Sequence, residues 1–422
     1  MIKMDGSVIL ERLRGCQRIL LLQGPVGPFF SYLSDFLTES GKSVWKVNFN
    51  GGDEWFYRHP NAVAFKETPD RWQAFFDSLL THRRIDAVVL FGDCRSIHRT
   101  AILRARFRKI PVYVFEEGYI RPSFITFEYG GVNGNSQLPR PNLLLDDLTA
   151  QPLSFPRNKP VFKKLVRYAV TYHIAGYAGR RNYPHYCHHK PFDIVAEARR
   201  WIKAIWRRFF LQWKEKNIAR RLKEDLKKRY FLVPLQVYND SQIKSHSGFG
   251  SMRAFITHVL QSFAEHAPDE YFLVFKHHPM DRGHRDYGPQ IARQTAHLGI
   301  TERVLYIHDQ HLPTLLKNAL GTITVNSTVG ISSLYHGTPL KVLGRAVYDL
   351  EGLTCQDSLN AFWSNPVPPD QTLFHKFRNY LIQFTQVYGS FYSGEAIKGN
   401  RPVQPTVDWE MLHEQAFDEL AA

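Results

Sequence analysis

Short apolar runs rich in β-branched and aromatic residues recur along this chain, and each ends at polar or turn residues. Four of them are especially clear: VYVFEEGY, YFLVPLQVYND, YFLVFKHHP and GTITVNSTVG, which begin at Val112, Tyr230, Tyr271 and Gly321. Runs of this length bounded by polar residues predict buried parallel strands. Because ligands bind outside the carboxyl ends of such strands, the polar residues that follow them are candidate site residues.

Strand and helix patterns alternate in two separate blocks of the sequence. In the first third we expect strands over 18–24, 43–49, 86–93 and 110–117, and helices over 29–37, 71–80 and 98–107. In the final third we expect strands over 231–237, 271–277, 303–309, 321–327 and 339–344, and helices over 252–266, 290–298, 312–318 and after Val329. This alternation predicts an α/β fold with two doubly wound parallel sheets.

One segment between the blocks carries the charge imbalance of the chain. The 422 residues are enough for two domains, and the formal net charge is +15. Residues 157–230 hold 21 Lys and Arg against 5 Asp and Glu, whereas the remainder holds 33 basic and 34 acidic residues. A local field of this kind indicates an anionic partner.

Residues 193–229 lack glycine and proline, which predicts one or two long helices. Their apolar residues follow the spacing of one helix stripe: Val195, Ala198, Ile202, Ile205, Phe209 and Trp213. One interpretation is an inter-domain helix whose stripe packs in the core. Another is a helix that lies on an anionic membrane surface, because tryptophan and phenylalanine with lysine and arginine are typical of such helices. Nucleic acid is a third partner class, but no nucleic-acid-binding motif accompanies the segment.

Other features limit the class of protein. No apolar run is long enough to predict a transmembrane helix, and the amino terminus lacks a signal-peptide core, so we expect a cytoplasmic protein. The cysteines at 16, 94, 187 and 355 are scattered and predict no disulfide framework. The cluster of His185, Cys187, His188 and His189 lacks a second ligand pair, so we expect no metal and no cofactor.

Carboxylates follow two of the predicted strands. Glu116 and Glu117 end the strand VYVF, and their side chains should point to opposite faces, so only one of them can face a cleft. A shielded glutamate there could serve as general acid or base, while the alternative is a surface turn. Gln236 and Asp240 close another strand; Asp240 either caps the next helix or pairs with Glu117 for retaining glycosyl transfer.

Groups suited to anions follow the remaining strands. Lys276, His278 and Pro279 combine a cation, an imidazole and a turn, which favours a phosphate site. Asn326, Ser327 and Thr328 precede a helical pattern, where hydroxyls cap a helix and can also bind an anion.

In the first block, the glycines of the loop GPVGP, Gly24 and Gly27, fit neither a Walker A loop nor a dinucleotide fingerprint. We expect this loop to shape a pocket with the strand-end residues Asp53 and Asp93.

With these residues in view, the chain resembles the capsule polysaccharide biosynthesis family, and within it the β-Kdo transferases of the KpsS/LipB type. The resemblance extends from about residue 18 to about residue 392 and is carried by LLLQGPVGPFF, FNGGD, FGDCR, FEEGYIRPSFITFEYGGVN, LQVYNDSQI, KHHPMDRGHR and VNSTVGIS.

The resemblance implies a GT-B-like architecture with two Rossmann-like domains. It implies an acceptor-side domain over 1–155, a basic membrane-facing segment over 156–229, a CMP-sugar-binding domain over 230–370, and C-terminal helices over 371–422 that pack back on the first domain. It further implies transfer of Kdo, with retention, from CMP-β-Kdo to a (lyso)phosphatidylglycerol acceptor. This reaction starts the poly-Kdo linker of capsular polysaccharide at the cytoplasmic face of the inner membrane in Gram-negative bacteria.

The resemblance also implies roles for individual residues. Glu117, where related transferases often carry aspartate, becomes the acid/base with Glu116 beside it, and Asp240 becomes the nucleophile. Donor contacts fall to Gln236, Lys276, His278, Pro279, Asn326, Ser327 and Thr328. The acceptor side comprises Gly24, Gly27, Asp53, Asp93 and Arg121. Expected partners are the anionic lipid, the membrane surface and other capsule proteins, without nucleic acid. The alternatives are a non-catalytic export or scaffold protein, and a transferase that uses another CMP-sugar such as CMP-sialic acid.

Overall fold

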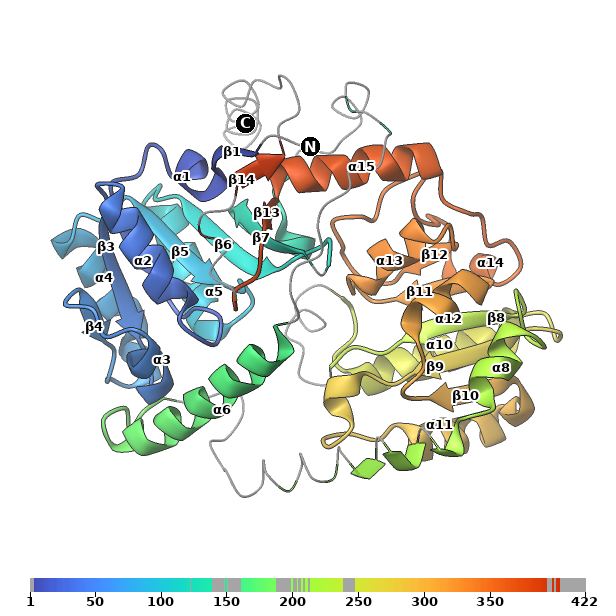
Figure 1. Ribbon diagram of the computed structural model, residues 1–422. Coiled ribbons are helices and arrows are strands. Elements are labelled where there is room, and N and C mark those ends of the chain that lie inside the picture. Colours follow the sequence, from blue (N-terminus) through green and yellow to red (C-terminus); the bar gives the residue numbers. More distant parts are fainter. Residues whose placement is uncertain are drawn as a thin grey trace. The chain divides into compact units, whose positions relative to one another are not determined.

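The computed structural model describes most of the chain as two compact units (Figure 1). The described residues are 4–121, 123–138, 148, 150, 161–186, 199, 203, 206–207, 209–211, 213–237, 247–392, 397 and 400–402. The first unit contains the chain up to Leu148, the described residues of 161–186, and the chain from Arg378 on. The second contains the described residues from 199 to Phe377.

The first unit is built on a seven-stranded sheet in the order β13-β7-β6-β5-β2-β3-β4. Its strands are β2 (Arg18–Leu21), β3 (Ser43–Asn48), β4 (Ala62–Ala64), β5 (Ala87–Phe91), β6 (Val112–Glu117), β7 (Phe124–Tyr129) and β13 (Gln386–Tyr388). Its helices are α1 (Val8–Arg12), α2 (Phe29–Glu39), α3 (Gly51–Phe56), α4 (Trp72–His82), α5 (Ser96–Phe107) and α6 (Phe162–Ala178). A two-stranded sheet pairs β1 (Met4–Ser7) with β14 (Asn400–Pro402).

The second unit is built on a five-stranded, all-parallel sheet in the order β10-β9-β8-β11-β12. Its strands are β8 (Tyr230–Pro234), β9 (Phe272–Lys276), β10 (Val304–Ile307), β11 (Gly321–Thr324) and β12 (Leu340–Val342). Its helices are α8 (Ile218–Lys223), α10 (Met252–His266), α11 (Gly288–His297), α12 (Leu312–Asn318), α13 (Val329–Tyr335) and α14 (Leu359–Phe362). Helix α15 (Gln371–Phe384) begins in this unit and ends in the first.

The central strands of each sheet bury apolar side chains on both faces, and helices cover both faces. In β2, Ile19 and Leu21 pack with α2, whereas Leu20 packs with α4 and α5 on the opposite face. In the second unit, Phe231 of β8 packs with α10, and Leu232 packs with α8 and α12. The predicted α/β fold with two sheets of mainly parallel strands is therefore confirmed.

The first sheet departs from the prediction in two strands. β7 runs antiparallel to β6, and β13 runs antiparallel to β7. The connection from β6 to β7 is too short for a parallel crossover, which needs a dozen residues or more. At its start, a Cβ on Gly118 would lie 2.1 Å from the carbonyl oxygen of Phe124, so only glycine fits this turn.

The two units divide the basic segment that the sequence suggested as a separate region over 156–229. Helix α6 belongs to the first unit and packs against α3, whereas α8 belongs to the second. Among the described residues, no helix has both the length and the apolarity that a membrane crossing requires.

Candidate functional site

The strand order of each sheet reverses at one point, where parallel α/β sheets bind ligands. In the second unit this switch point lies between β8 and β11. Gln236 follows β8 and Asn326 follows β11, and both are almost fully buried. The Gln236 Nε2 donates to Asn326 Oδ1 at 2.9 Å, and the Asn326 amide nitrogen donates to Gln236 Oε1 at 3.4 Å. This reciprocal pair fixes the two strand ends beside one another and brings two of the predicted donor residues together.

Lys276 ends β9, the strand next to β8, and only 7% of its surface is exposed. Burial lowers the pKa of its ammonium group, and Arg282 lowers it further, while Asp309 and Glu215 act in the opposite direction. No described residue forms a hydrogen bond or an ion pair with this ammonium group. A buried cation costs free energy unless it is paired, so Lys276 is well suited to receive an anion.

The His-Pro sequence after Lys276 forms a tight turn. The ring of His278 is half-buried, and its Nδ1 accepts a hydrogen bond from the Met280 amide at 3.2 Å. This bond caps the short 3₁₀ turn Pro279–Asp281, with proline at its first position. The His278 imidazole, which we predicted from the sequence to contact a phosphate, therefore also caps this turn.

The hydroxyl residues after β11 lie at the surface of the same strand end. Ser327 and Thr328 are partly exposed. The Ser327 Oγ accepts a hydrogen bond from the Val329 amide at 3.2 Å, whereas the Thr328 side chain makes no capping bond. The Tyr348 hydroxyl donates to the Ser327 carbonyl oxygen and holds the turn. The nucleophile predicted at Asp240 lies outside the described residues, which resume at Ser247.

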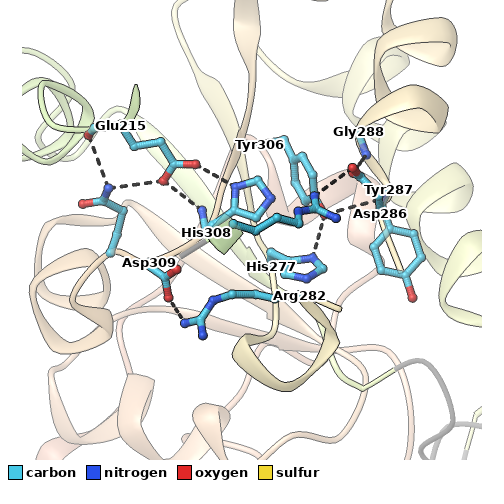
Figure 2. A network of polar contacts seen from close by, with 11 residues as sticks. Glu215, His277, Arg282, Asp286, Tyr287, Gly288, Tyr306, His308 and Asp309 are labelled. Atoms are coloured by element: carbon cyan, nitrogen blue, oxygen red, sulfur yellow. Dashed lines mark hydrogen bonds and ion pairs between the residues drawn. The ribbon is translucent and has the colours of Figure 1, made fainter. Parts of the chain in front are cut away.

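A polar network that the sequence analysis missed joins the ends of β9 and β10 (Figure 2). Glu215 Oε1 lies 2.7 Å from His308 Nδ1, and its Oε2 accepts from the His308 amide at 3.0 Å. These contacts lower the pKa of the Glu215 carboxyl despite its burial. Nearby, the Tyr306 hydroxyl lies 2.6 Å from His277 Nδ1, and burial lowers the pKa of His277 to about 3, so this imidazole is neutral. His308 lies near the end of the strand predicted over 303–309, and the observed strand β10 ends just before it, so the strand-end rule could have found it.

In the first unit the switch point lies between β2 and β5. Arg95 follows β5 and donates from NH1 to Gln23 Oε1, at the end of β2, at 2.8 Å. Gln23 Nε2 in turn donates to Tyr186 at 2.9 Å and lies 3.2 Å from the Tyr172 hydroxyl. Gln23 and Arg95 follow strands. Tyr172 lies in α6 and Tyr186 lies after it, and no pattern in the sequence indicated either tyrosine.

Asp53 is buried in this network. Its carboxylate accepts hydrogen bonds from the Phe49 amide at 3.0 Å, the Tyr172 hydroxyl at 3.0 Å and Asn50 Nδ2 at 3.3 Å. Asp53 therefore ties α3 to α6. Gly24, Gly27, Asp53 and Tyr172 line one small pocket, and Asp93 is not part of its lining.

The other residues predicted for the acceptor side lie at or after neighbouring strand ends. Asp93 is buried and accepts hydrogen bonds from the Val132 amide at 3.1 Å and from Asn135 Nδ2 at 3.0 Å, so its carboxylate holds a loop. Arg121 is exposed, and its Nε donates to the Gly118 carbonyl oxygen at 3.2 Å.

The two glutamates at the end of β6 point to opposite faces of the sheet, as predicted. Alternation places Glu116 on the face of Val112 and Val114, and Glu117 on the face of Phe115. The Glu116 carboxyl is shielded from water, and this desolvation raises its pKa to about 7. The Glu117 amide, which donates to Glu116 Oε1 at 3.0 Å, acts against this shift, and the Glu117 and Asp93 carboxylates reinforce it. Of the pair, Glu116 thus has the raised pKa that acid/base catalysis near neutral pH requires.

A search for metal ligands gives a negative result within the described part of the chain. No group of three or more histidine, cysteine, aspartate or glutamate side chains there is arranged to hold an ion. Three of the residues in the cluster considered from the sequence, Cys187, His188 and His189, lie outside that part.

Comparisons with known proteins point to one family. The family model described as "Capsule polysaccharide biosynthesis protein" matches residues 86–392. The "Capsule polysaccharide export protein KpsS" of Escherichia coli is 44% identical over 390 residues, which cover 92% of this chain and 100% of that protein. The "Capsule polysaccharide modification protein LipB" of Neisseria meningitidis serogroup A is 43% identical over 391 residues, 90% of this chain and 93% of that protein.

A solved structure of low sequence identity also aligns with most of the chain. The β-Kdo 2,7 transferase of Thermosulfurimonas dismutans KpsC aligns with a TM-score of 0.42 at 14% identity, covering 96% of this chain and 99% of that one.

Proposed function

Because the chain belongs to the capsule polysaccharide biosynthesis family, we propose that it is a retaining glycosyltransferase that acts in the making of capsular polysaccharide. Its donor is CMP-β-Kdo, and its acceptor is a hydroxyl of (lyso)phosphatidylglycerol, so that the product starts the poly-Kdo linker. Because the acceptor is a membrane lipid, the enzyme must act at a membrane surface, at the cytoplasmic face of the inner membrane.

Lys276 is the observation that carries this proposal. It is a largely buried cation that forms no hydrogen bond or ion pair with a described residue, at the carboxyl end of a strand beside the switch point, although the Asp309 and Glu215 carboxylates act to raise its pKa. Its neighbours offer a carboxamide pair, Gln236 and Asn326, and the hydroxyl of Ser327. CMP-Kdo presents a phosphate and a carboxylate, and such groups fit a cation flanked by neutral hydrogen-bonding groups.

Retention is explained by two displacements at the anomeric carbon of Kdo. In the first, a carboxylate assigned to Asp240 forms a bond to this carbon while the bond to the phosphate oxygen breaks, and CMP leaves with the electron pair. In the second, the acceptor hydroxyl oxygen forms a bond to the same carbon, its proton passes to a base, and the carboxylate is released. Lys276 stabilises the phosphate as its negative charge grows during the first step.

The base is drawn from the pair at the end of β6. The sequence favours Glu117, and the resemblance assigns it the same role. The raised pKa of Glu116 favours this neighbour instead, since a carboxyl with a pKa of about 7 can both accept and donate a proton near neutral pH. Single substitutions by glutamine separate the two: the variant that lacks the base loses turnover, and the other retains most of it.

The test is a transfer assay with the purified protein, CMP-β-Kdo and fluorescent lysophosphatidylglycerol, read by mass spectrometry of the lipid. The expected product carries one or more added Kdo residues. A panel with CMP-sialic acid distinguishes a transferase of another CMP-sugar, because only the donor that is used labels the lipid. Absence of turnover with every donor and every phosphatidylglycerol-type acceptor would contradict the proposal and favour a non-catalytic export or scaffold role.

A further inference from the structure

Four large aromatic side chains are exposed on one face of the helical residues 206–214. Their exposed fractions are 64% for Trp206, 66% for Phe209, 43% for Phe210 and 69% for Trp213. Their spacing of three and four residues places them on one side of a helix, and the rings of Trp206 and Phe210 stack at 5.3 Å. Aromatic surface of this extent is rarely left to water in a soluble protein.

The opposite face of the same helix is attached to the second unit. Arg207, Leu211 and Glu215 follow one another at intervals of four residues. The Arg207 guanidinium pairs with Asp286 at 2.8 Å, the Leu211 side chain is buried, and Glu215 binds His308. The aromatic face therefore cannot turn inward without the loss of these polar contacts. This corrects the interpretation that the stripe packs in the core, because Phe209 and Trp213 face solvent; Val195, Ala198, Ile202 and Ile205 are outside the described residues.

Basic side chains accompany the aromatic face. Arg199, Lys203, Lys214 and Lys216 are all exposed, and residues 157–230, with 21 basic and 5 acidic residues, carry the net positive charge of the chain. Aromatic residues at the boundary between water and hydrocarbon, with lysine and arginine at the headgroups, are the composition of helices that lie on anionic membranes. A protein partner would explain the aromatic residues alone. A nucleic acid could use both kinds of residue, but no nucleic-acid-binding motif accompanies the segment.

We propose that this face, formed by Trp206, Phe209, Phe210 and Trp213 with Arg199 and Lys203, is the surface by which the protein lies on anionic lipid. The rings enter the interfacial layer of the membrane, and the two cations contact lipid phosphates. The inference rests on the proposed function for the presence of a membrane and deepens it by naming the surface that makes the contact. Vesicle binding without a sugar nucleotide can succeed or fail separately from the transfer reaction.

The test is co-sedimentation of the full-length protein with vesicles, without a sugar nucleotide. One set of vesicles is phosphatidylcholine, and the other contains about one-third phosphatidylglycerol, a composition that attracts basic segments. Wild-type protein is expected to bind the anionic vesicles at least ~10-fold more tightly, with weaker binding at high salt. Replacing all four aromatic residues by serine should weaken this binding by ~100-fold or more, because each buried ring contributes substantially to interfacial affinity. Arg199→Glu with Lys203→Glu should weaken binding to the anionic vesicles only.

A matched control removes exposed aromatic residues elsewhere. Trp55 and Phe107 are 51% and 78% exposed and belong to α3 and α5 of the first unit. Their double replacement by serine should leave vesicle binding unchanged, and an unchanged melting temperature shows that each variant is folded. Wild-type binding by the fourfold variant overturns the inference. So does light scattering in which the fourfold variant converts a wild-type dimer into a monomer, because the face would then bind a second copy.

Discussion

Replacement of Lys276 by methionine should change activity and stability in opposite directions. Lys276 is 7% exposed as a residue, and no described residue forms a hydrogen bond or an ion pair with its ammonium group. Burial without a partner lowers its pKa, so at neutral pH the charged form costs free energy in the folded protein. Methionine fills a similar volume without a charge. We expect a gain of about 1 kcal/mol in the free energy of unfolding, since a buried unpaired polar group costs about 1–3 kcal/mol. For a unit of this size, such a gain raises the melting temperature by roughly 2–4 °C.

The loss of activity follows from the charge on the phosphate. As the bond from the anomeric carbon breaks, the phosphate of CMP passes from one negative charge toward two, so Lys276 binds the transition state more tightly than the substrate. Hydrogen bonds to charged groups contribute about 1.5–3 kcal/mol, which corresponds to roughly 10- to 100-fold in rate. We therefore expect kcat to fall by about this factor, with a smaller change in KM.

Initial rates over a range of CMP-Kdo concentrations, together with thermal unfolding, provide both readouts. Lys317→Met is the control, because Lys317 is an exposed lysine on α12 of the same unit and should affect neither quantity. A Lys276→Met protein that is less stable, or one that is as active as the wild type, would refute the assignment of this lysine to the donor phosphate.

Three further perturbations test other parts of the structure. Glu116→Gln should stabilise the protein at pH 8 by up to about 3 kcal/mol and have little effect near pH 4. The folded pKa of Glu116 is raised to about 7, so ionisation of this carboxyl destabilises the wild-type protein as the pH rises above the unfolded pKa. Urea unfolding at both pH values measures the difference. Tyr172→Phe should cost about 1–3 kcal/mol in urea unfolding, because Asp53 loses the hydroxyl that donates at 3.0 Å, and an unchanged midpoint would contradict this. The folded pKa of Glu215 is lowered, so its carboxylate stabilises the wild-type protein above pH 4.5 and this stabilisation is lost in acid. Glu215→Gln should remove it. Denaturation at pH 7 and pH 3 should show a lower free energy of unfolding for the variant only at the higher pH.

The strand ends could be predicted from the sequence because buried parallel strands are continuous apolar runs with polar residues after them. The helices 252–266 and 312–318 are found within the predicted bounds, and Gln236 and Asn326 meet because β8 and β11 are neighbours. Strand β7 was not predicted, since FITFEY alternates little and follows a turn rather than a crossover. Tyr172 and Tyr186 were not predictable either, because they lie in and after α6, whose position depends on tertiary packing.

The basic segment shows why periodicity alone could not decide between its interpretations. An apolar stripe has the same spacing whether it faces a core or a lipid surface, so the sequence left both open. The residues that decide are the polar ones on the other side of the helix. Arg207 and Glu215, which a helical wheel would assign to solvent, pair with Asp286 and His308 of the second unit. Because these two residues attach the charged face of the helix to its own protein, the aromatic face remains available for an anionic membrane. The partners of Arg207 and Glu215 therefore decide between the two interpretations of the apolar stripe.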